Sequence, residues 1–129
     1  MIVSLHVATG AAAGALAGSR ARALVAGPLV HALGDLTPHE DIPSTWFEAV
    51  SGALAVAFVA RSRGALHPAT IGALAASIPD VEHVLPWRLR GRKLFPTHRH
   101  AGWHKRGGVP AWVQLTAAAL VIALVTHRA

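Results

Sequence analysis

Cysteine is absent from the 129 residues, and charged residues make up only 14% of the chain. The lack of cysteine excludes disulfide bridges, thiolate metal sites and a cysteine nucleophile. Any bound metal must therefore use nitrogen and oxygen ligands, for which nine histidines and six carboxylates are present. Because an average soluble domain has roughly 25% charged residues, the deficit, together with 53% hydrophobic residues, indicates a non-aqueous environment.

The chain is long enough for one domain, residues 1–129, and too short for two. Its formal charge is +6, and the positive residues fall in short clusters beside apolar stretches. Such placement is typical of helices anchored to anionic lipid headgroups. We therefore expect membrane lipids as partners, and we do not expect nucleic acid.

Long apolar runs are also few. Five apolar stretches lack the period-2 alternation of strands and therefore predict helices: residues 2–18, 21–34, 47–60, 65–78 and 110–126. Only the first and last reach the lower limit of about 17 residues for a spanning helix. Since lipid admits only helices for such a pattern, we predict an all-α integral membrane bundle of about four to five short helices, with a metal site at one end.

Glycine recurs every four residues in the first stretch, at Gly10, Gly14 and Gly18. Small residues at this spacing form a flat face on which another helix can approach closely. His6 lies four residues before Gly10, on the same face. Two interpretations are open: His6 points into the bundle, or it lies at the membrane interface.

Polar residues are segregated between the two ends of the predicted bundle. If every helix crosses, then the N-terminus and the loops 35–46 and 80–109 share one side, with the acidic residues (Glu48 is borderline) and most histidines. Carboxylates and imidazoles in an apolar protein are costly unless they are paired or bind metal. The opposite side receives arginines together with His67 and His127, which we interpret as structural or interfacial.

The first polar cluster is His31, Asp35, Pro38, His39 and Asp41. His31 and Asp35 are four residues apart and share a helix face, an arrangement that can hold one metal ion. Pro38 ends the helix, which places His39 and Asp41 in the following turn. The alternative is a helix cap followed by an ordinary polar loop.

Two further clusters lie on the same predicted side. Asp80 and His83 are three residues apart, again on one helical face. His98, His100 and His104 are interleaved with Arg and Lys, which suits metal ligation or phosphate binding. The alternative for this last cluster is a solvated basic loop near headgroups.

Together these segments resemble the small bacterial membrane-bound metal-dependent hydrolases, which are distantly similar to zinc-dependent phospholipase C. The resemblance rests on the early His6, on His31-x-x-x-Asp35-x-x-Pro38-His39-x-Asp41, on Gly72 to His83, and on His98 to His104. The last segment departs from the family pattern, since Lys105 stands where serine is usual. The departure leaves both His98 and His100 as candidate ligands.

The resemblance implies hydrolysis of a phosphoester or lipid-linked substrate, assisted by one or two zinc ions, in the bacterial inner membrane. The expected metal ligands are His6, His31, Asp35, His39, Asp80, His83, His98 and His104. Asp41 or Glu82 is expected as general base, and Arg90, Arg99 and Lys105 as residues that neutralise a phosphate or headgroup. The positive-inside rule weakly favours a cytoplasmic site.

Two other functions stay open. One is a non-catalytic membrane protein with a structural or vestigial metal site. The other is a metal or proton transporter, which requires ionisable residues in mid-helix. Nearly all the ionisable residues here fall at predicted helix ends, so transport is the weakest of the three interpretations.

Overall fold

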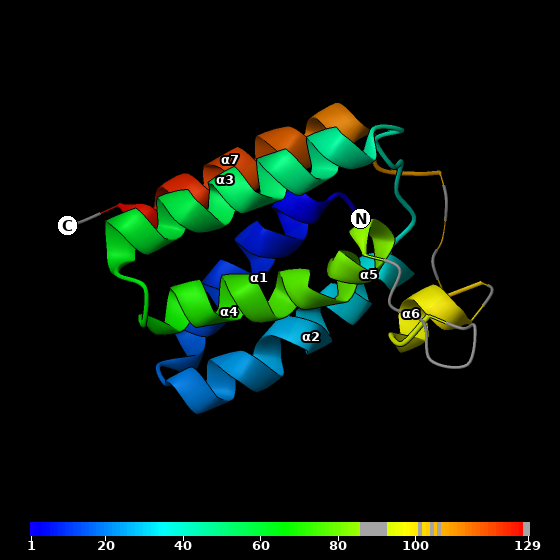
Figure 1. Cartoon of the computed structure of the whole chain (residues 1–129). Helices are drawn as coiled ribbons and strands as arrows, with labels where there is room; N and C mark the ends of the chain where they lie inside the picture. Colours follow the sequence, from blue (N-terminus) through cyan, green and yellow to red (C-terminus); the bar gives the residue numbers. More distant parts are fainter. Residues whose placement is uncertain (86–92, 101, 104, 106, 128–129) are drawn as a thin grey trace.

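The computed structural model describes residues 1–85, 93–100, 102–103, 105 and 107–127, and these form an all-α structure (Figure 1). Every predicted apolar stretch forms a helix, and two short helices and a 3₁₀ turn, η1, are added after the fourth. Within the described residues the only β pairing is an isolated bridge between His39 and Val109. The elements are α1 (Val3–Ala17), α2 (Arg20–Leu36), α3 (Thr45–Arg63), α4 (Pro68–Ser77), η1 (Ile78–Asp80), α5 (Val81–Val84), α6 (Pro96–Arg99) and α7 (Ala111–Thr126).

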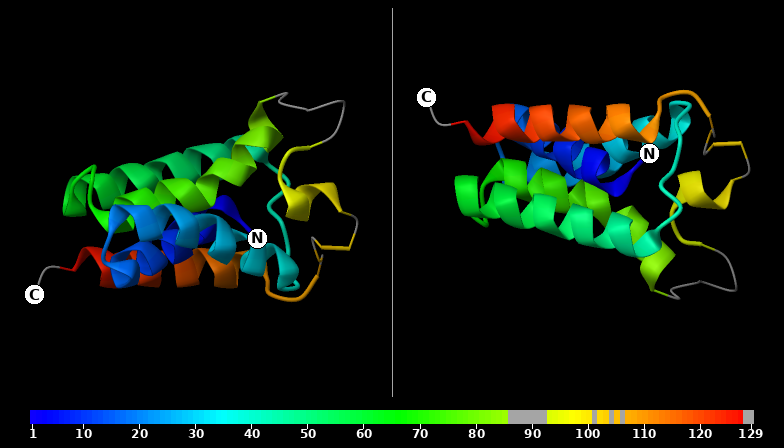
Figure 2. Two further views of the ribbon diagram at one scale, coloured as in Figure 1. Left: turned by 90° about the horizontal axis from the view of Figure 1, so that it is seen from below. Right: turned by 90° about the horizontal axis from the view of Figure 1, so that it is seen from above.

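The five long helices run in alternating directions along the bundle (Figures 1 and 2). This brings the chain start, the end of α2, the start of α3, α5, α6 and the start of α7 to one end, here called the site end. The α1–α2 and α3–α4 connections and the end of α7 lie at the other, here called the far end. The predicted gathering of the polar segments at one end is therefore confirmed.

Helix α1 is the central helix and contacts α2, α3, α4 and α7. Small residues allow this close packing, because the buried core consists of Val7, Ala11, Val59, Ala69 and Ala73. The apolar stretches are rich in alanine, so their helices approach closely with little side-chain volume between them.

Glycines bring α1 and α4 into backbone contact. A Cβ atom added to Gly10 would lie 2.5 Å from the Gly72 carbonyl oxygen, and one added to Gly14 would lie 2.2 Å from the Pro68 carbonyl oxygen. The predicted glycine face is thus confirmed for Gly10 and Gly14. It is wrong for Gly18, which ends α1 in the left-handed conformation (φ 69°) with nothing near its missing side chain.

Several polar side chains cap the helices. Ser19 accepts a hydrogen bond from Arg22 N at the start of α2, and Ser44 accepts one from Phe47 N at the start of α3. His67 Nδ1 accepts from Ala69 N at the start of α4. His67 is therefore an N-cap, in line with its predicted structural role.

No helix in the described part of the chain combines the length and the apolar character needed to cross a bilayer.

Large apolar side chains are nevertheless exposed along the bundle. Leu16 is 89% exposed, and Leu124 is 77% exposed. Others lie on α2, α3 and α7: Leu24, Val25, Leu29, Leu33, Leu54, Phe58 and Leu120. Where such side chains form a contiguous surface, they usually mark a contact with lipid or with another protein.

Candidate metal centre

The site begins in the last turns of α2, where His31 and Asp35 lie one helical turn apart and are both buried. His31 Nδ1 is 2.8 Å from the carbonyl oxygen of Ala76. Because a carbonyl can only accept, Nδ1 donates a proton to it, and Nε2 is the ring nitrogen directed into the site. That Nε2 faces Asp35 Oδ2 at 3.1 Å.

His98 approaches the same carboxylate from the short helix α6. Its Nδ1 lies 2.6 Å from Glu82 Oε1, so the Glu82 carboxylate fixes the ring and its tautomer. Its Nε2 lies 3.3 Å from Asp35 Oδ2 and 3.4 Å from His31 Nε2. Only 1% of the His98 side chain is exposed.

These three atoms, His31 Nε2, His98 Nε2 and Asp35 Oδ2, form a triangle with sides of 3.1, 3.3 and 3.4 Å. Tetrahedral zinc with ligands at about 2.0–2.1 Å separates its donor atoms by about 3.3–3.4 Å. Both imidazoles also give their other ring nitrogen to an oxygen acceptor, as metal-bound histidines nearly always do. The triangle is therefore of a size that could hold a metal ion.

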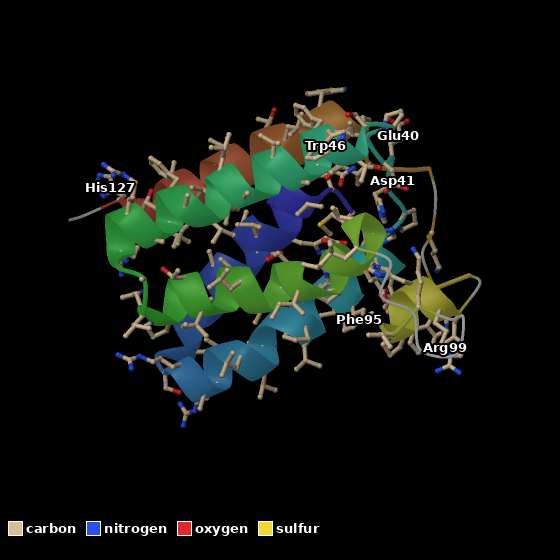
Figure 3. The ribbon with its side chains drawn as sticks, viewed as in Figure 1. Glu40, Asp41, Trp46, Phe95, Arg99 and His127 are labelled. Atoms are coloured by element: carbon tan, nitrogen blue, oxygen red, sulfur yellow. The ribbon has the colours of Figure 1, made fainter. Side chains whose placement is uncertain are left out.

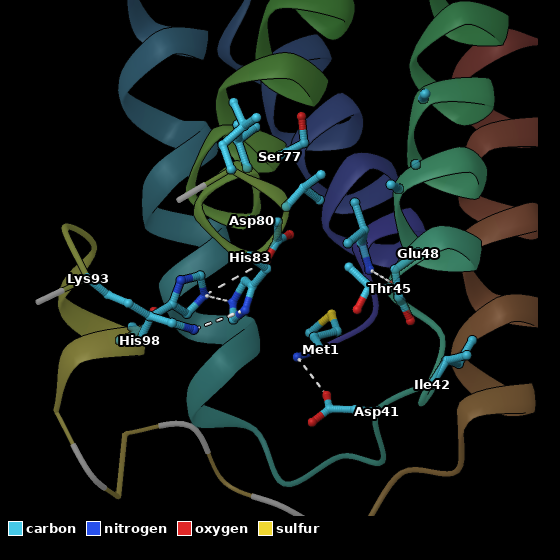
Figure 4. A pocket seen from close by; sticks show the side chains of 18 of the residues that line it. Met1, Asp41, Ile42, Thr45, Glu48, Ser77, Asp80, His83, Lys93 and His98 are labelled. Carbon is cyan, nitrogen blue, oxygen red and sulfur yellow. Dashed lines mark hydrogen bonds and ion pairs between the residues drawn. The ribbon is translucent and has the colours of Figure 1, made fainter. Parts of the chain in front are cut away.

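Asp80 and His83 border this triangle from η1 and α5. Asp80 Oδ1 lies 3.8 Å from His98 Nε2, and His83 Nε2 lies 3.5 Å from it (Figure 4). Asp80, His31 and His98 together have donor atoms within 4.8 Å of one another. Since His83 is exposed and Asp80 is 12% exposed, the cluster is open on this side.

His6 completes a second group, with His31 and Asp35, whose donor atoms also lie within 4.8 Å. Its Nε2 is 3.2 Å from Asp35 Oδ1, and its ring stacks on His31 at 3.8 Å. Yet neither ring nitrogen is aligned for a hydrogen bond with any described residue. A fully buried imidazole without hydrogen bonds is costly, and a metal ion would remove that cost. Of the two interpretations of His6, the structure places it inside the bundle.

The other side of Asp35 faces the start of the chain. Asp35 Oδ1 lies 3.3 Å from the Met1 nitrogen, which also contacts His39 Nε2. His39 Nε2 is in turn 3.1 Å from Asp41 Oδ1. His39 and Asp41 thus adjoin the cluster through Met1, beside Asp35 Oδ1.

Asp80, His98 and Glu82 have shifted pKa values. Burial raises the pKa of Asp80 to about 6. Burial lowers the pKa of His98, but hydrogen bonds to Asp35 and Glu82 outweigh it and leave this pKa above its usual value. Burial raises the pKa of Glu82, but hydrogen bonds from Leu94 N and His98 lower it by more. The pKa of Glu82 therefore lies below its usual value. Glu82 is therefore a carboxylate that holds His98 in place.

Apart from Glu82, which holds His98 in place, the predicted site residues fall into four groups. Six converge on one cluster: His6, His31, Asp35, Asp80, His83 and His98. His39 and Asp41 adjoin it, while Arg99 and Lys105 are exposed around it, Lys105 donating its backbone N–H to Asp35 O at 3.2 Å. Arg90 and His104 lie outside the described residues. Between the two candidates left open, His98 enters the cluster, whereas His100 is exposed beside Trp103.

Sequence reasoning missed several supporting residues. Thr97 is buried and donates from Oγ1 to Asp35 Oδ2 at 2.6 Å. Lys93 Nζ lies 3.0 Å from His83 Nδ1. Neither has a spacing that reveals its role. Gln114 hydrogen-bonds Ile2 N, Glu40 O and Val109 O beside the cluster. Its structural role could have been predicted, because it is a lone amide within an apolar stretch.

Figure 3 shows the two ends of the bundle, with Asp41, Phe95 and Arg99 at the site end and His127 at the far end.

Comparison of the chain with family models, curated proteins and solved structures finds no match. The resemblance to membrane-bound metal-dependent hydrolases therefore stays an expectation from the motifs. The geometry of the His/Asp cluster is what supports a function.

Proposed function

We propose that this protein is a metal-dependent hydrolase that holds zinc in the His/Asp cluster and cleaves a phosphoester. The observation that carries the proposal is the triangle of His31 Nε2, His98 Nε2 and Asp35 Oδ2, whose sides match the donor separations around tetrahedral zinc. Nitrogen and carboxylate oxygen donors are suited to this metal. His6, with neither ring nitrogen aligned for a hydrogen bond with the described residues, lies beside the other oxygen of Asp35 and is a further candidate donor, so the triangle itself keeps an open position.

The burial pattern favours catalysis over a purely structural metal. A structural zinc site is closed by four protein ligands, whereas a catalytic site leaves one position open. Here His6, His31 and Asp35 are buried, while the Asp80 and His83 side borders a cavity (Figure 4). A substrate could approach the cluster from that side.

The surrounding residues have separable parts in the proposed reaction. When bound there, zinc would supply Lewis-acid chemistry that activates water near neutral pH. Glu82 and Thr97 orient His98 and Asp35, because their hydrogen bonds fix those side chains. Since Glu82 is engaged in this way, we assign the general base to Asp41, which is 45% exposed and lines the cavity. Arg99 lines the cavity too, and is proposed to attract the phosphate.

We further propose that the bundle contacts membrane lipid, in the bacterial inner membrane with the site end toward the cytoplasm. The exposed apolar side chains on α2, α3 and α7 support this. Trp46 and Trp112, 79% and 70% exposed, begin α3 and α7 at the site end, where interfacial tryptophans are common.

The test is metal analysis of the purified protein, combined with hydrolysis of bis(p-nitrophenyl) phosphate. We expect stoichiometric zinc and turnover in the natural sequence, and loss of both in His98→Gln. His127→Gln removes the same kind of side chain at the far end and should leave both unchanged. Stoichiometric zinc without turnover over a broad substrate panel would favour the structural-metal alternative, and absence of zinc would overturn the proposal.

A further inference from the structure

A groove runs from the metal cluster along the bundle between α3 and the α4–α5 segment (Figure 4). Its volume is about 1180 Å³, at the upper end of typical ligand pockets. The α3 wall is one helical stripe, because its lining positions recur at intervals of three and four: Thr45, Glu48, Ala49, Gly52, Ala53, Val56 and Ala57. The facing wall is a similar stripe that includes Leu74, Ser77, Val81 and Val84.

The groove changes character along its length. At the site end it is lined by the carboxylates Asp41, Glu48 and Asp80, by His83 and His98, and by Lys93 and Arg99. Away from the site end the lining is apolar and small, with alanines on α3 and a leucine on α4. With a metal ion in the cluster, the Lys93 and Arg99 side of the site end suits an anionic polar group, and the rest of the groove suits a slender apolar one.

Small exposed residues define the shape of the apolar part. Ala53 and Ala57 are both exposed, and neither carries enough side chain to fill the space beside it. Leu54 and Phe58, their neighbours on α3, are 65% and 53% exposed and do not line the groove. An apolar groove that leads from the candidate metal cluster, with Lys93 and Arg99 beside it, onto exposed apolar surface fits a hydrocarbon chain whose headgroup carries negative charge.

We propose that this groove binds the alkyl chain of an anionic amphiphile and presents its phosphate headgroup to the cluster, so that the substrate is a phospholipid-like phosphoester. The inference rests on the proposed function for the reaction itself, but the binding of the chain can be tested alone. The polar site end and the narrow apolar lining together favour this occupant over a second protein helix. An apolar helix face offers no group that would bind the cationic and metal-ligating side chains at the site end.

The decisive variants are Ala53→Trp, which fills the groove, and Leu54→Trp, which adds an indole to the adjacent position outside it. The probes are hexadecyl phosphate and butyl phosphate, whose binding to the zinc-loaded protein is measured by calorimetry at fixed detergent concentration. We expect Ala53→Trp to weaken hexadecyl phosphate binding about tenfold and to leave butyl phosphate unchanged, because only the long chain reaches position 53. Leu54→Trp should alter neither affinity.

Hydrolysis provides the second readout, with p-nitrophenyl hexadecyl phosphate and p-nitrophenyl butyl phosphate as substrates. Ala53→Trp should raise KM for the long-chain substrate alone, with kcat for the short-chain substrate and zinc content unchanged. Ala57→Trp, one turn further along α3, provides a second variant if Ala53→Trp does not fold.

The outcomes separate the two proposals. If neither substrate is hydrolysed but hexadecyl phosphate binding still depends on position 53, the reaction is wrong and the groove assignment stands. Equal effects of the two tryptophans, or equal affinity for both chain lengths, would overturn the groove assignment whatever the activity. A change from dimer to monomer in Ala53→Trp would show that a second copy of the chain occupies the groove, and would overturn it as well.

Discussion

The two ends of the bundle are built from the same alanine-rich helices but use histidine in opposite ways. At the far end, His67 caps α4 and is bonded to Ala69 N. At the site end, His31 and His98 give one ring nitrogen to an oxygen acceptor and point the other at Asp35. The difference teaches that the second ring nitrogen, and what it faces, distinguishes a candidate ligand from a capping histidine.

The largest effect is expected for Asp35→Asn, because this carboxylate meets His31 and His98 with one oxygen and His6 with the other. We expect zinc affinity to fall by at least about a hundredfold, measured by competition with a chromophoric chelator. Asn keeps the size of the side chain, so a folding defect is not expected. His67→Asn at the far end is the control, and an equal loss there would break the comparison between the ends.

The next largest effect is expected for the packing of α1 against α4, on which the arrangement of both ends depends. A Cβ atom on Gly72 would lie 2.2 Å from the Gly10 carbonyl oxygen, so Gly72→Ala must push α1 and α4 apart. We expect a loss of about 1–3 kcal/mol in the free energy of unfolding, measured by denaturant titration with chelator present. Ala119→Val on the exposed face of α7 should change it by no more than about 0.5 kcal/mol.

Glu82→Gln should have a smaller effect, confined to the site end. The variant keeps a hydrogen-bond acceptor for His98 Nδ1 but loses the negative charge that favours this orientation. We expect about tenfold weaker zinc binding with unchanged unfolding free energy, so that both titrations are needed. An unaltered zinc affinity would return Glu82 to the list of candidate general bases.

The pH dependence of zinc binding tests the roles assigned to Asp80 and His98 at the site end. Asp80, with a pKa of about 6, and His98, with a pKa above its usual value, hold protons in the metal-free protein at mildly acidic pH. Zinc must displace the proton of its ligand His98 and is bound more tightly when the neighbouring Asp80 is ionised, so its apparent affinity should fall as the pH is lowered from 8 to 5. Asp80→Asn should make this dependence shallower. An affinity that is independent of pH over this range would contradict the assignment of these ligands.

The smallest effect is expected for His100→Ala. His100 is exposed, and its ring contacts Trp103 at 5.4 Å without entering the triangle. We expect less than a twofold change in zinc affinity by the same competition assay. A loss comparable to that of His98→Gln would mean that the wrong member of this pair has been assigned.

Much of this arrangement could be predicted from the sequence, because it depends on periodicity. Apolar runs gave the five long helices, and the i, i+4 spacing placed His31 and Asp35 on one face. The convergence of distant clusters followed from the alternating direction of the helices. These features depend on local geometry and chain connectivity, which spacing reports directly.

Other features depend on contacts that no spacing encodes. Glu82 was expected as a candidate general base, but it lies beside His98, which is 16 positions further along the chain. Thr97 hydrogen-bonds Asp35 across 62 positions, so its role appears only when both are placed in space. Gly18 continued the four-residue repeat, yet it ends the helix, because a repeat does not show where a helix stops.

Gln114 of α7 hydrogen-bonds with three backbone groups: it accepts from Ile2 N and donates to Glu40 O and Val109 O. One amide thus fastens the first residues of the chain to the loop after α2. Helix α7 supplies no proposed ligand. Its Gln114 nevertheless fixes Ile2 and Glu40 beside the cluster, so these residues reach their final positions only after α7 has packed. During synthesis the pocket would therefore be completed only after α7 has emerged, and a metal ion held in the cluster would be captured after that point.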